Sequence, residues 1–316
     1  MRKNIACSLA ILVLRFMFVS AQTAAYPYTN ARGEHEQFIL DIEQSQQQET
    51  KAPVKMILLS TGIKMEYTEQ GDKNGTPVIL LHGFTDSYHS FDLALPHLPS
   101  SLHVFSLSQR GHGNSDRPDK GYHPKDFAAD VAAFMDALQI KKAVIAGHSM
   151  GSIVTQQFVI SYPQYVSGVV LIGAFARLHD KPELLEFGKV IAGLKDPIDY
   201  NFIKEFQQST IIKPVPGHFF ETVMQESVKV PAKVWRGVFE ELLKVDNVQA
   251  LTNVKTPAMI MWGNKDAFCP GKDQQTLLTA IDGSVLITYP DIGHAPHWEV
   301  PERFAADLVN FINTLK

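Results

Sequence analysis

Ser149 stands in a sequence that favours the use of its hydroxyl group as a nucleophile. The pentapeptide Gly147–Gly151 reads Gly-His-Ser-Met-Gly, and the apolar run Ala143–Ala146 directly precedes it. Residues 153–161 have the spacing of apolar side chains that is typical of a helix. We therefore expect a buried strand, a tight turn with Ser149 at its tip, and a helix. This order is the structural context of the G-x-S-x-G nucleophile motif.

The two glycines explain how such a turn would present Ser149. The turn is so tight that it would strain the backbone of the serine, and Cβ atoms at Gly147 and Gly151 would collide with the neighbouring strand and helix. The hydroxyl group would then stand at the N-terminus of a helix, where the dipole and free N–H groups favour developing negative charge. A glycine-rich turn without chemistry is the alternative, and residues elsewhere in the chain decide between the two.

Apolar runs alternate with helical patterns on both sides of this turn. Strands are expected at residues 54–60, 63–69, 78–81, 103–107, 143–146, 169–172, 258–262 and 285–289. Helices are expected at residues 126–138, at 274–281 and at the C-terminus. The alternation predicts an α/β protein with a mostly parallel, eight-stranded sheet flanked by helices, and such sheets carry their sites at the carboxyl ends of the strands.

The alternation stops between residues 175 and 247, where short helical patterns separated by prolines replace the strand runs. These patterns cover residues 184–191, 202–206, 219–228 and 234–243. We interpret residues 175–247 as a helical cap inserted into a core of residues 54–174 and 248–316. The cap is rich in Phe and also contains Trp235, which favours an apolar acyl or aromatic substrate.

Five short motifs resemble, in this order along the chain, the landmarks of the α/β-hydrolase superfamily. They are His82-Gly83-Phe84, Arg110–Gly113, Gly147–Gly151, Gly263–Asp266 and Gly293-His294. The resemblance covers roughly residues 54–316 and points to the serine-nucleophile, esterase-like branch with a helical cap. Haloalkane dehalogenases and epoxide hydrolases are similar around residues 110–113 but use an aspartate nucleophile, so the serine argues against their chemistry.

The superfamily order of nucleophile, acid and histidine identifies the partners of Ser149. Asp266 follows the predicted strand Ala258–Trp262, and His294 follows the predicted strand Val285–Tyr289. Both are therefore expected at the same sheet edge as Ser149. A serine hydroxyl is a weak nucleophile, so His294 would take its proton. Asp266 would hold the imidazole in the useful tautomer and stabilise the imidazolium ion.

Two backbone N–H groups are needed to stabilise the oxyanion of acyl transfer. Met150 directly follows the nucleophile and would supply one of them. The resemblance places the other at Phe84. The side chains expected to contact the substrate are those of Phe84, His148, Met150 and Trp298.

Other residues near these motifs are interpreted as structural. His82 would brace the oxyanion loop, and Arg110 and His112 would pack near the site. The resemblance assigns Glu299 a bracing role in the loop that follows His294. Cys269 has no base partner in the sequence and is interpreted as structural.

Composition limits the classes of partner and cofactor. The chain has 316 residues, of which 45% are apolar, so it can bury a sizeable core. Its net charge of −4 gives no basic excess, so no nucleic-acid partner is expected. No cluster of Cys and His has zinc spacing, and neither a metal nor a cofactor is expected. The expected partner is a small ester-type substrate, bound by a monomer or a homodimer.

The N-terminus has the pattern of a secretory signal peptide. Two basic residues precede the apolar run Ile5–Val19, and small residues follow it. We expect cleavage after residue 25, or after residue 21, and a secreted or periplasmic protein without stable membrane insertion. Arg15 interrupts the run, so an uncleaved anchor is the alternative, although the run is short for a membrane span. Residues 26–53 are rich in Gln and Glu and predict a polar linker.

Together, these expectations predict a serine hydrolase that cleaves carboxylic esters through an acyl-enzyme. Carbon–carbon bond hydrolases, lactonases and cofactor-free haloperoxidases use the same three residue types, and they remain alternatives because a fold does not fix a substrate. A ligand receptor on the same fold is the alternative from another class. Turnover of p-nitrophenyl acetate, compared with that of the Ser149→Ala variant, separates an enzyme from a receptor.

Overall fold

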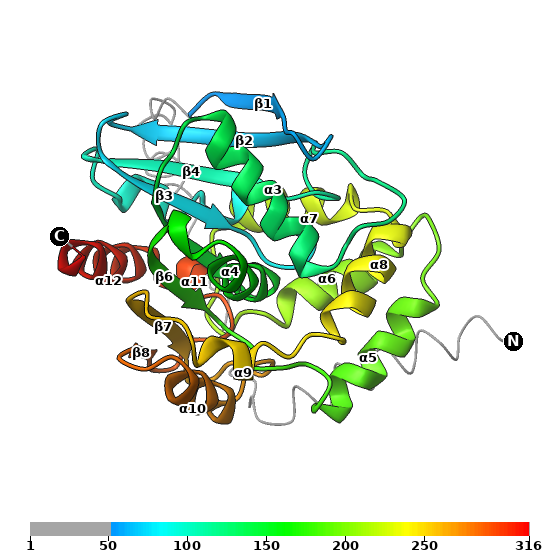
Figure 1. The fold of residues 1–316 in the computed structure, drawn as a ribbon. Helices are drawn as coiled ribbons and strands as arrows, with labels where there is room; N and C mark the ends of the chain where they lie inside the picture. Colours follow the sequence, from blue (N-terminus) through cyan, green and yellow to red (C-terminus); the bar gives the residue numbers. More distant parts are fainter. Residues whose placement is uncertain (1–51, 316) are drawn as a thin grey trace, which may run out of the picture.

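A single eight-stranded sheet organises the computed structural model, which describes residues 52–315 (Figure 1). Its strands are β1 (Val54–Leu58), β2 (Lys64–Gly71), β3 (Thr76–Leu81), β4 (Leu102–Ser108), β5 (Ala143–His148), β6 (Val166–Ile172), β7 (Ala258–Gly263) and β8 (Val285–Tyr289). They lie in the order β1-β2-β4-β3-β5-β6-β7-β8. The β1–β2 and β2–β4 pairs are antiparallel, and all other pairs are parallel. The predicted fold class is confirmed.

Helices cover both faces of the sheet, so the central strands are apolar on both faces. Alternate residues of β3 belong to different cores. Ile79 and Leu81 belong to a core with side chains of α3 (Pro124–Ala137), α4 (Met150–Ser161) and α10 (Gly271–Ala280). Val78 and Leu80 belong to a second core with side chains of α12 (Pro301–Thr314). This two-sided burial fixes the strand register, because a shift by one residue would exchange the two sets of side chains.

Helices fill the long connection between β6 and β7. They are α5 (Pro182–Ala192), α6 (Tyr200–Gln208), α7 (Gly217–Val228), α8 (Ala232–Leu242) and the short α9 (Val248–Leu251). All four helical patterns of residues 175–247 are therefore helices in the structure. Figure 1 shows α5 to α8 grouped on the side of the molecule away from α12. The two ends of the connection meet at Arg177 and Asp246, which form an antiparallel bridge and an ion pair at 2.9 Å.

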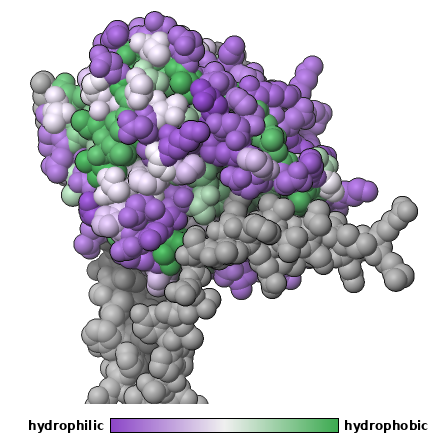
Figure 2. Space-filling model, turned by 90° about the horizontal axis from the view of Figure 1, so that it is seen from below, coloured by the Kyte–Doolittle hydropathy of each residue, from purple (hydrophilic) through white to green (hydrophobic). Residues whose placement is uncertain are grey.

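The remaining helical segments are short and lie near strand ends. They are η1 (Tyr88–Phe91), η2 (Leu95–His97), η3 (Pro163–Tyr165) and α11 (Pro296–Glu299). Within residues 52–315, no helix has the length and apolar character needed to cross a membrane. On the face that Figure 2 shows, apolar residues form small groups separated by hydrophilic ones. The predicted signal peptide, and residues 26–51 of the predicted linker, lie outside the described residues.

Candidate active site

Ser149 occupies a strained turn between β5 and α4. Its backbone angles are φ 52° and ψ −114°, outside the regions that side chains with a Cβ usually adopt. A Cβ atom on Gly147 would lie 2.0 Å from the carbonyl oxygen of Gly151, and one on Gly151 would lie 2.3 Å from that of Leu81. Only glycine fits at these two positions. The packing of β3, β5 and α4 therefore holds Ser149 at the N-terminus of α4.

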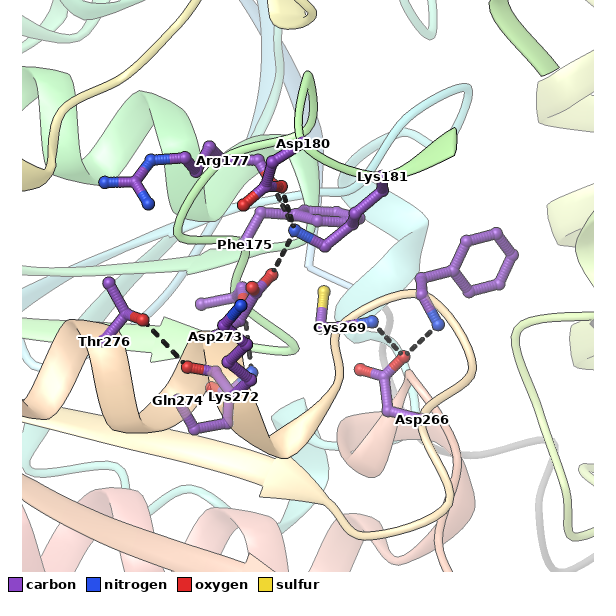
Figure 3. Close-up of polar contacts among 12 residues, drawn as sticks. Phe175, Arg177, Asp180, Lys181, Asp266, Cys269, Lys272, Asp273, Gln274 and Thr276 are labelled. Atoms are coloured by element: carbon purple, nitrogen blue, oxygen red, sulfur yellow. Dashed lines mark hydrogen bonds and ion pairs between the residues drawn. The ribbon is translucent and has the colours of Figure 1, made fainter. Parts of the chain in front are cut away.

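His294 and Asp266 form a buried hydrogen-bonded pair. His294 Nδ1 lies 2.8 Å from Asp266 Oδ2. The other carboxylate oxygen, Oδ1, accepts the backbone N–H groups of Phe268 at 2.8 Å and Cys269 at 2.9 Å, which Figure 3 shows as dashed lines. The carboxylate is thus fixed with Oδ2 directed at the imidazole. Nδ1 carries the proton in this arrangement, and Nε2 is the ring nitrogen that can accept one.

One cavity, partly open to solvent, brings the predicted residues together. Ser149 and His294 both line it, and Asp266 lies behind His294 outside the lining. The four side chains expected to contact a substrate, those of Phe84, His148, Met150 and Trp298, also line it. Most of the remaining wall is apolar and comes from the β6–β7 connection: Phe175, Leu178, Leu184, Phe187, Phe206, Phe239 and Leu242. The cavity therefore combines a few polar groups with a largely apolar surface.

Phe84 and Met150, which line this cavity, have backbone N–H groups without an acceptor in the described part of the chain. Met150 is the first residue of α4, so its N–H has no partner within the helix. The pair has the character of an oxyanion-binding site, with the dipole of α4 adding to it.

The imidazole of His148 is a neutral part of the cavity wall. Burial and the neighbouring imidazoles of His297 and His294 hold the pKa of His148 well below its ordinary value. Its Nε2 lies 3.1 Å from the carbonyl oxygen of His294 and donates to it, so the ring supports the His294 backbone. Trp298 is fixed in a similar way, because its Nε1 donates to the carbonyl oxygen of Ser90 at 2.7 Å.

His82 and Arg110 act on the structure around the cavity without lining it. His82 Nδ1 lies 2.7 Å from the carbonyl oxygen of Gly83, and His82 Nε2 accepts the backbone N–H of Gln109 at 2.9 Å. The guanidinium group of Arg110 binds both carboxylate oxygens of Asp130, at 2.6 and 2.7 Å. The predicted bracing role of His82 and the structural role of Arg110 both agree with these contacts.

Asp86 and Gln207 also line the cavity, and the sequence analysis missed them. The side chain of Asp86 accepts hydrogen bonds from Gln207 Nε2 at 3.1 Å and from Ser90 Oγ at 3.3 Å. Burial raises the pKa of Asp86 to about 7, although these hydrogen bonds oppose the shift. The position of Asp86, two residues after Phe84, could have indicated from the sequence that it lies near the cavity. Gln207 had no signal, because it is a polar residue within a helical pattern.

Asp266, Cys269 and His294 place three potential metal-ligand atoms within 4.8 Å of one another. Their hydrogen bonds argue against a metal centre. Both oxygens of Asp266 are engaged, and the Cys269 thiol donates to the carbonyl oxygen of Gly173 at 3.2 Å. Burial, reinforced by the charge of Asp266, raises the pKa of this thiol well above its ordinary value, whereas a metal ligand must be the thiolate.

A buried ion pair ties the start of the β6–β7 connection to α10, the helix that follows the Asp266 loop (Figure 3). Lys181 Nζ lies 2.9 Å from Asp273 Oδ2 and 2.9 Å from Asp180 Oδ1. Burial opposes the charge of Lys181, but the hydrogen bonds to the two carboxylates outweigh it and raise the pKa of the lysine. The ring of Phe175, part of the cavity wall, lies 6.0 Å from the same Nζ.

Comparisons with known proteins agree with this fold. Residues 76–209 match the family model described as the alpha/beta hydrolase fold. The AB hydrolase superfamily protein YisY of Bacillus subtilis is 26% identical over 253 residues, which cover 76% of this chain and 93% of that protein. An esterase (EaEST) from Exiguobacterium antarcticum has a TM-score of 0.74 at 23% identity, covering 82% of this chain and 99% of the other. A bromoperoxidase from Bacillus anthracis has a TM-score of 0.75 at 22% identity, covering 83% and 100%.

Proposed function

We propose that this chain, which belongs to the α/β-hydrolase superfamily, is a serine hydrolase that cleaves carboxylic esters. The observation that carries the proposal is that the strained Ser149 and the imidazole of His294, which Asp266 holds, line one cavity together with Phe84 and Met150, whose backbone N–H groups have no acceptor among the described residues. Each group required for acyl transfer has a counterpart among these residues.

Ser149 Oγ would attack the ester carbonyl carbon while its proton moves to Nε2 of His294. The negative charge that develops on the carbonyl oxygen would be stabilised by the N–H groups of Phe84 and Met150. Asp266 Oδ2, at 2.8 Å from Nδ1, would stabilise the imidazolium ion. Collapse of the intermediate would release the alcohol, which takes the proton from His294. Water, deprotonated by the same imidazole, would then release the acid from the acyl-enzyme.

The apolar lining of the cavity supports an ester with an apolar acyl group. Burial of apolar substrate surface against such a wall is favourable, and the few polar groups would fix the orientation. The esterase of known structure is similar in fold only, as is the bromoperoxidase. A substrate screen should therefore also include lactones, substrates of carbon–carbon bond hydrolases and substrates of haloperoxidases.

The N-terminal sequence pattern supports secretion or a periplasmic location.

Substitution of the nucleophile tests the proposal directly. Ser149→Ala should lower kcat for p-nitrophenyl acetate by at least about 10³-fold, and up to about 10⁶-fold, with substrate binding retained. It should also abolish covalent labelling by a fluorophosphonate. Ser161→Ala is the matched control, because Ser161 is exposed at the other end of α4. Equal turnover by purified Ser149→Ala and wild-type protein would exclude the mechanism, and a wild-type protein that binds but does not cleave esters would favour a receptor.

A further inference from the structure

The loop that presents the N–H of Phe84 depends on its surroundings for its shape. Within the loop, the backbone N–H of Asp86 donates to the carbonyl oxygen of Gly83 at 3.4 Å, which is long for such a bond. Thr85 has φ 69°, a left-handed conformation that a β-branched residue rarely adopts. Contacts from elsewhere must therefore hold this conformation in place.

Outside the β6–β7 connection, the end of the loop has one side-chain contact within residues 52–315, the 3.3 Å hydrogen bond from Ser90 Oγ of η1 to Asp86 Oδ2, and the other contacts fix its beginning. His82 is anchored through Gln109, whose backbone N–H and side-chain Nε2 donate to His82 Nε2 and to the His82 carbonyl oxygen, both at 2.9 Å. His82 in turn holds the carbonyl oxygen of Gly83. These contacts end before Thr85, where the backbone has its unusual conformation.

The β6–β7 connection supplies the side-chain contacts of Thr85 and the second hydrogen bond to the Asp86 side chain. Gln207 of α6 is fully buried, and its Nε2 lies 3.1 Å from Thr85 Oγ1, 3.1 Å from Asp86 Oδ1 and 2.8 Å from Ser227 Oγ. Ser227 of α7 lies 3.3 Å from Thr85 Oγ1 and 3.2 Å from the Thr85 carbonyl oxygen. One amide thus joins the oxyanion loop to two helices more than 100 residues away in sequence.

The same connection also holds the side chain of Phe84. Its ring packs edge-on against Trp235 of α8, with centroids 5.0 Å apart, and against Phe206 of α6 at 5.9 Å. Phe206 directly precedes Gln207, so α6 contacts both the ring of Phe84 and the two residues that follow it. The position of the Phe84 N–H group is therefore coupled to the position of α6.

We propose that Gln207 is a positioning residue for oxyanion stabilisation. Its carboxamide holds Thr85 and Asp86 so that the N–H of Phe84 faces the cavity. The helices between β6 and β7 thereby support the chemical step as well as forming the wall around the substrate. This inference rests on the proposed hydrolase function, because it assigns Gln207 a part in that reaction.

Removal of the carboxamide tests this role. Gln207→Met keeps the length of the side chain but cannot donate a hydrogen bond. We expect kcat for p-nitrophenyl acetate to fall about 10- to 100-fold, less than the loss of a whole oxyanion donor, with KM changed less than about threefold. Inhibition by a trifluoromethyl ketone, whose adduct carries the oxyanion, should weaken by the same factor as kcat.

Gln208→Met is the matched control, because Gln208 is the next residue of α6 and its side chain is exposed. It should leave kcat, KM and inhibition unchanged. An unchanged kcat in Gln207→Met, or a rise in KM alone, would overturn the proposal and make Gln207 a structural or substrate-contacting residue. A lower melting temperature with unchanged kcat would do the same.

Ser227→Ala gives a second test if Gln207→Met does not fold. It removes one acceptor of Gln207 and the contact with the Thr85 carbonyl oxygen, so kcat should fall about 3- to 10-fold with KM unchanged. Retention of full kcat would count against the network. Failure of the proposed function is distinguishable, because a wild-type protein that neither cleaves esters nor reacts with a fluorophosphonate overturns both proposals. Reactive wild-type protein with an unaffected Gln207→Met variant overturns this one alone.

Discussion

Asp86 illustrates how the surroundings of one residue govern its protonation. It is 3% exposed, and its hydrogen-bond partners Gln207 and Ser90 are uncharged. A buried carboxylate without a cationic partner is costly, so burial raises the pKa of Asp86 to about 7 from an ordinary value of 3.8. Between these two values the folded state binds more protons than the unfolded state. The free energy of unfolding should therefore fall as the pH rises through this range.

Asp86→Asn should remove this pH dependence. One pKa unit corresponds to about 1.4 kcal/mol, so ionisation of Asp86 should lower the free energy of unfolding by roughly 2–3 kcal/mol between pH 5 and pH 8. Asn does not ionise, so the variant should not lose this stability. The free energy of unfolding of the variant minus that of wild type should therefore increase by the same roughly 2–3 kcal/mol between pH 5 and pH 8. Urea unfolding at the two pH values measures it, with the exposed Asp282→Asn as control. An equal stability difference at both pH values would contradict the prediction.

A residue that belongs to a local motif could be predicted from the sequence. Ser149 lies between two glycines that only a tight turn requires, and its φ of 52° in the structure agrees with the expected strain. Gln207 and Asp86 could not be found in this way. Their contact joins residues 121 positions apart, and it exists only because α6 packs over the loop after β3. The apolar spacing of a helix indicates which of its side chains are buried. It does not indicate which residue a polar side chain will contact.

His294 lies in the loop between β8 and α12, and Glu299 holds this loop in place. Glu299 Oε1 accepts the backbone N–H of Gly293 at 2.8 Å. Its other oxygen accepts the N–H groups of Ile212 and Lys213, at 3.0 and 2.7 Å. One carboxylate thus joins the His294 loop to the segment between α6 and α7. These contacts agree with the expected bracing role of Glu299. The sequence did not indicate its hydrogen bonds with the β6–β7 connection.

Glu299→Gln should weaken this junction. The amide replaces one acceptor oxygen with a donor that faces backbone N–H groups, so the free energy of unfolding should fall by about 1–3 kcal/mol. Under the proposed mechanism, displacement of His294 should lower kcat roughly tenfold, because small shifts of a general base are expensive. Chemical denaturation and ester kinetics measure the two effects. Glu302→Gln, at an exposed position of α12, serves as control, and equal behaviour of the two variants would refute the bracing role.

Element boundaries show where a sequence pattern is insufficient. The apolar spacing predicts a helix over residues 126–138, whereas α3 runs from Pro124 to Ala137. The earlier start comes from a capping box, in which His123 accepts the N–H of Lys125 and Asp126 accepts the N–H of His123. Histidine is an uncommon N-cap, so the pattern of apolar residues begins later than the hydrogen bonds do.

At the scale of the whole molecule, the loops of the sheet carry the residues proposed for catalysis and the β6–β7 connection forms most of the cavity wall, but the two parts also contact each other. Loops at the carboxyl ends of the strands carry Ser149, Asp266 and His294, as expected of an open α/β sheet. The connection supplies most of the apolar cavity wall and packs on Phe84 in the same hydrophobic core. Deletion of residues 175–247 would expose this core and disturb the loop of residues 82–86. A substitution within the wall is therefore the better test of what selects the substrate.

Phe187 of α5 offers such a test. Its buried ring lines the cavity and stacks on Phe206 with centroids 5.7 Å apart. Phe187→Val should create space for about two methylene groups, so kcat/KM for p-nitrophenyl hexanoate relative to the acetate should rise about tenfold. Leu185→Val is the control on the same helix, because Leu185 is 40% exposed and does not line the cavity.

The ratio of kcat/KM for the hexanoate to that for the acetate separates an effect on acyl-chain selectivity from an effect on protein stability. A smaller side chain at position 187 also weakens packing in the connection, by about 1–3 kcal/mol if the loss follows other large-to-small substitutions. That loss lowers both rates together if the fraction of folded protein falls, and it leaves their ratio unchanged. An increase in the ratio for Phe187→Val alone therefore reports the shape of the wall. If both variants keep the wild-type ratio, α5 does not select the acyl chain, and selection must come from the wall near Ile153 and Phe268.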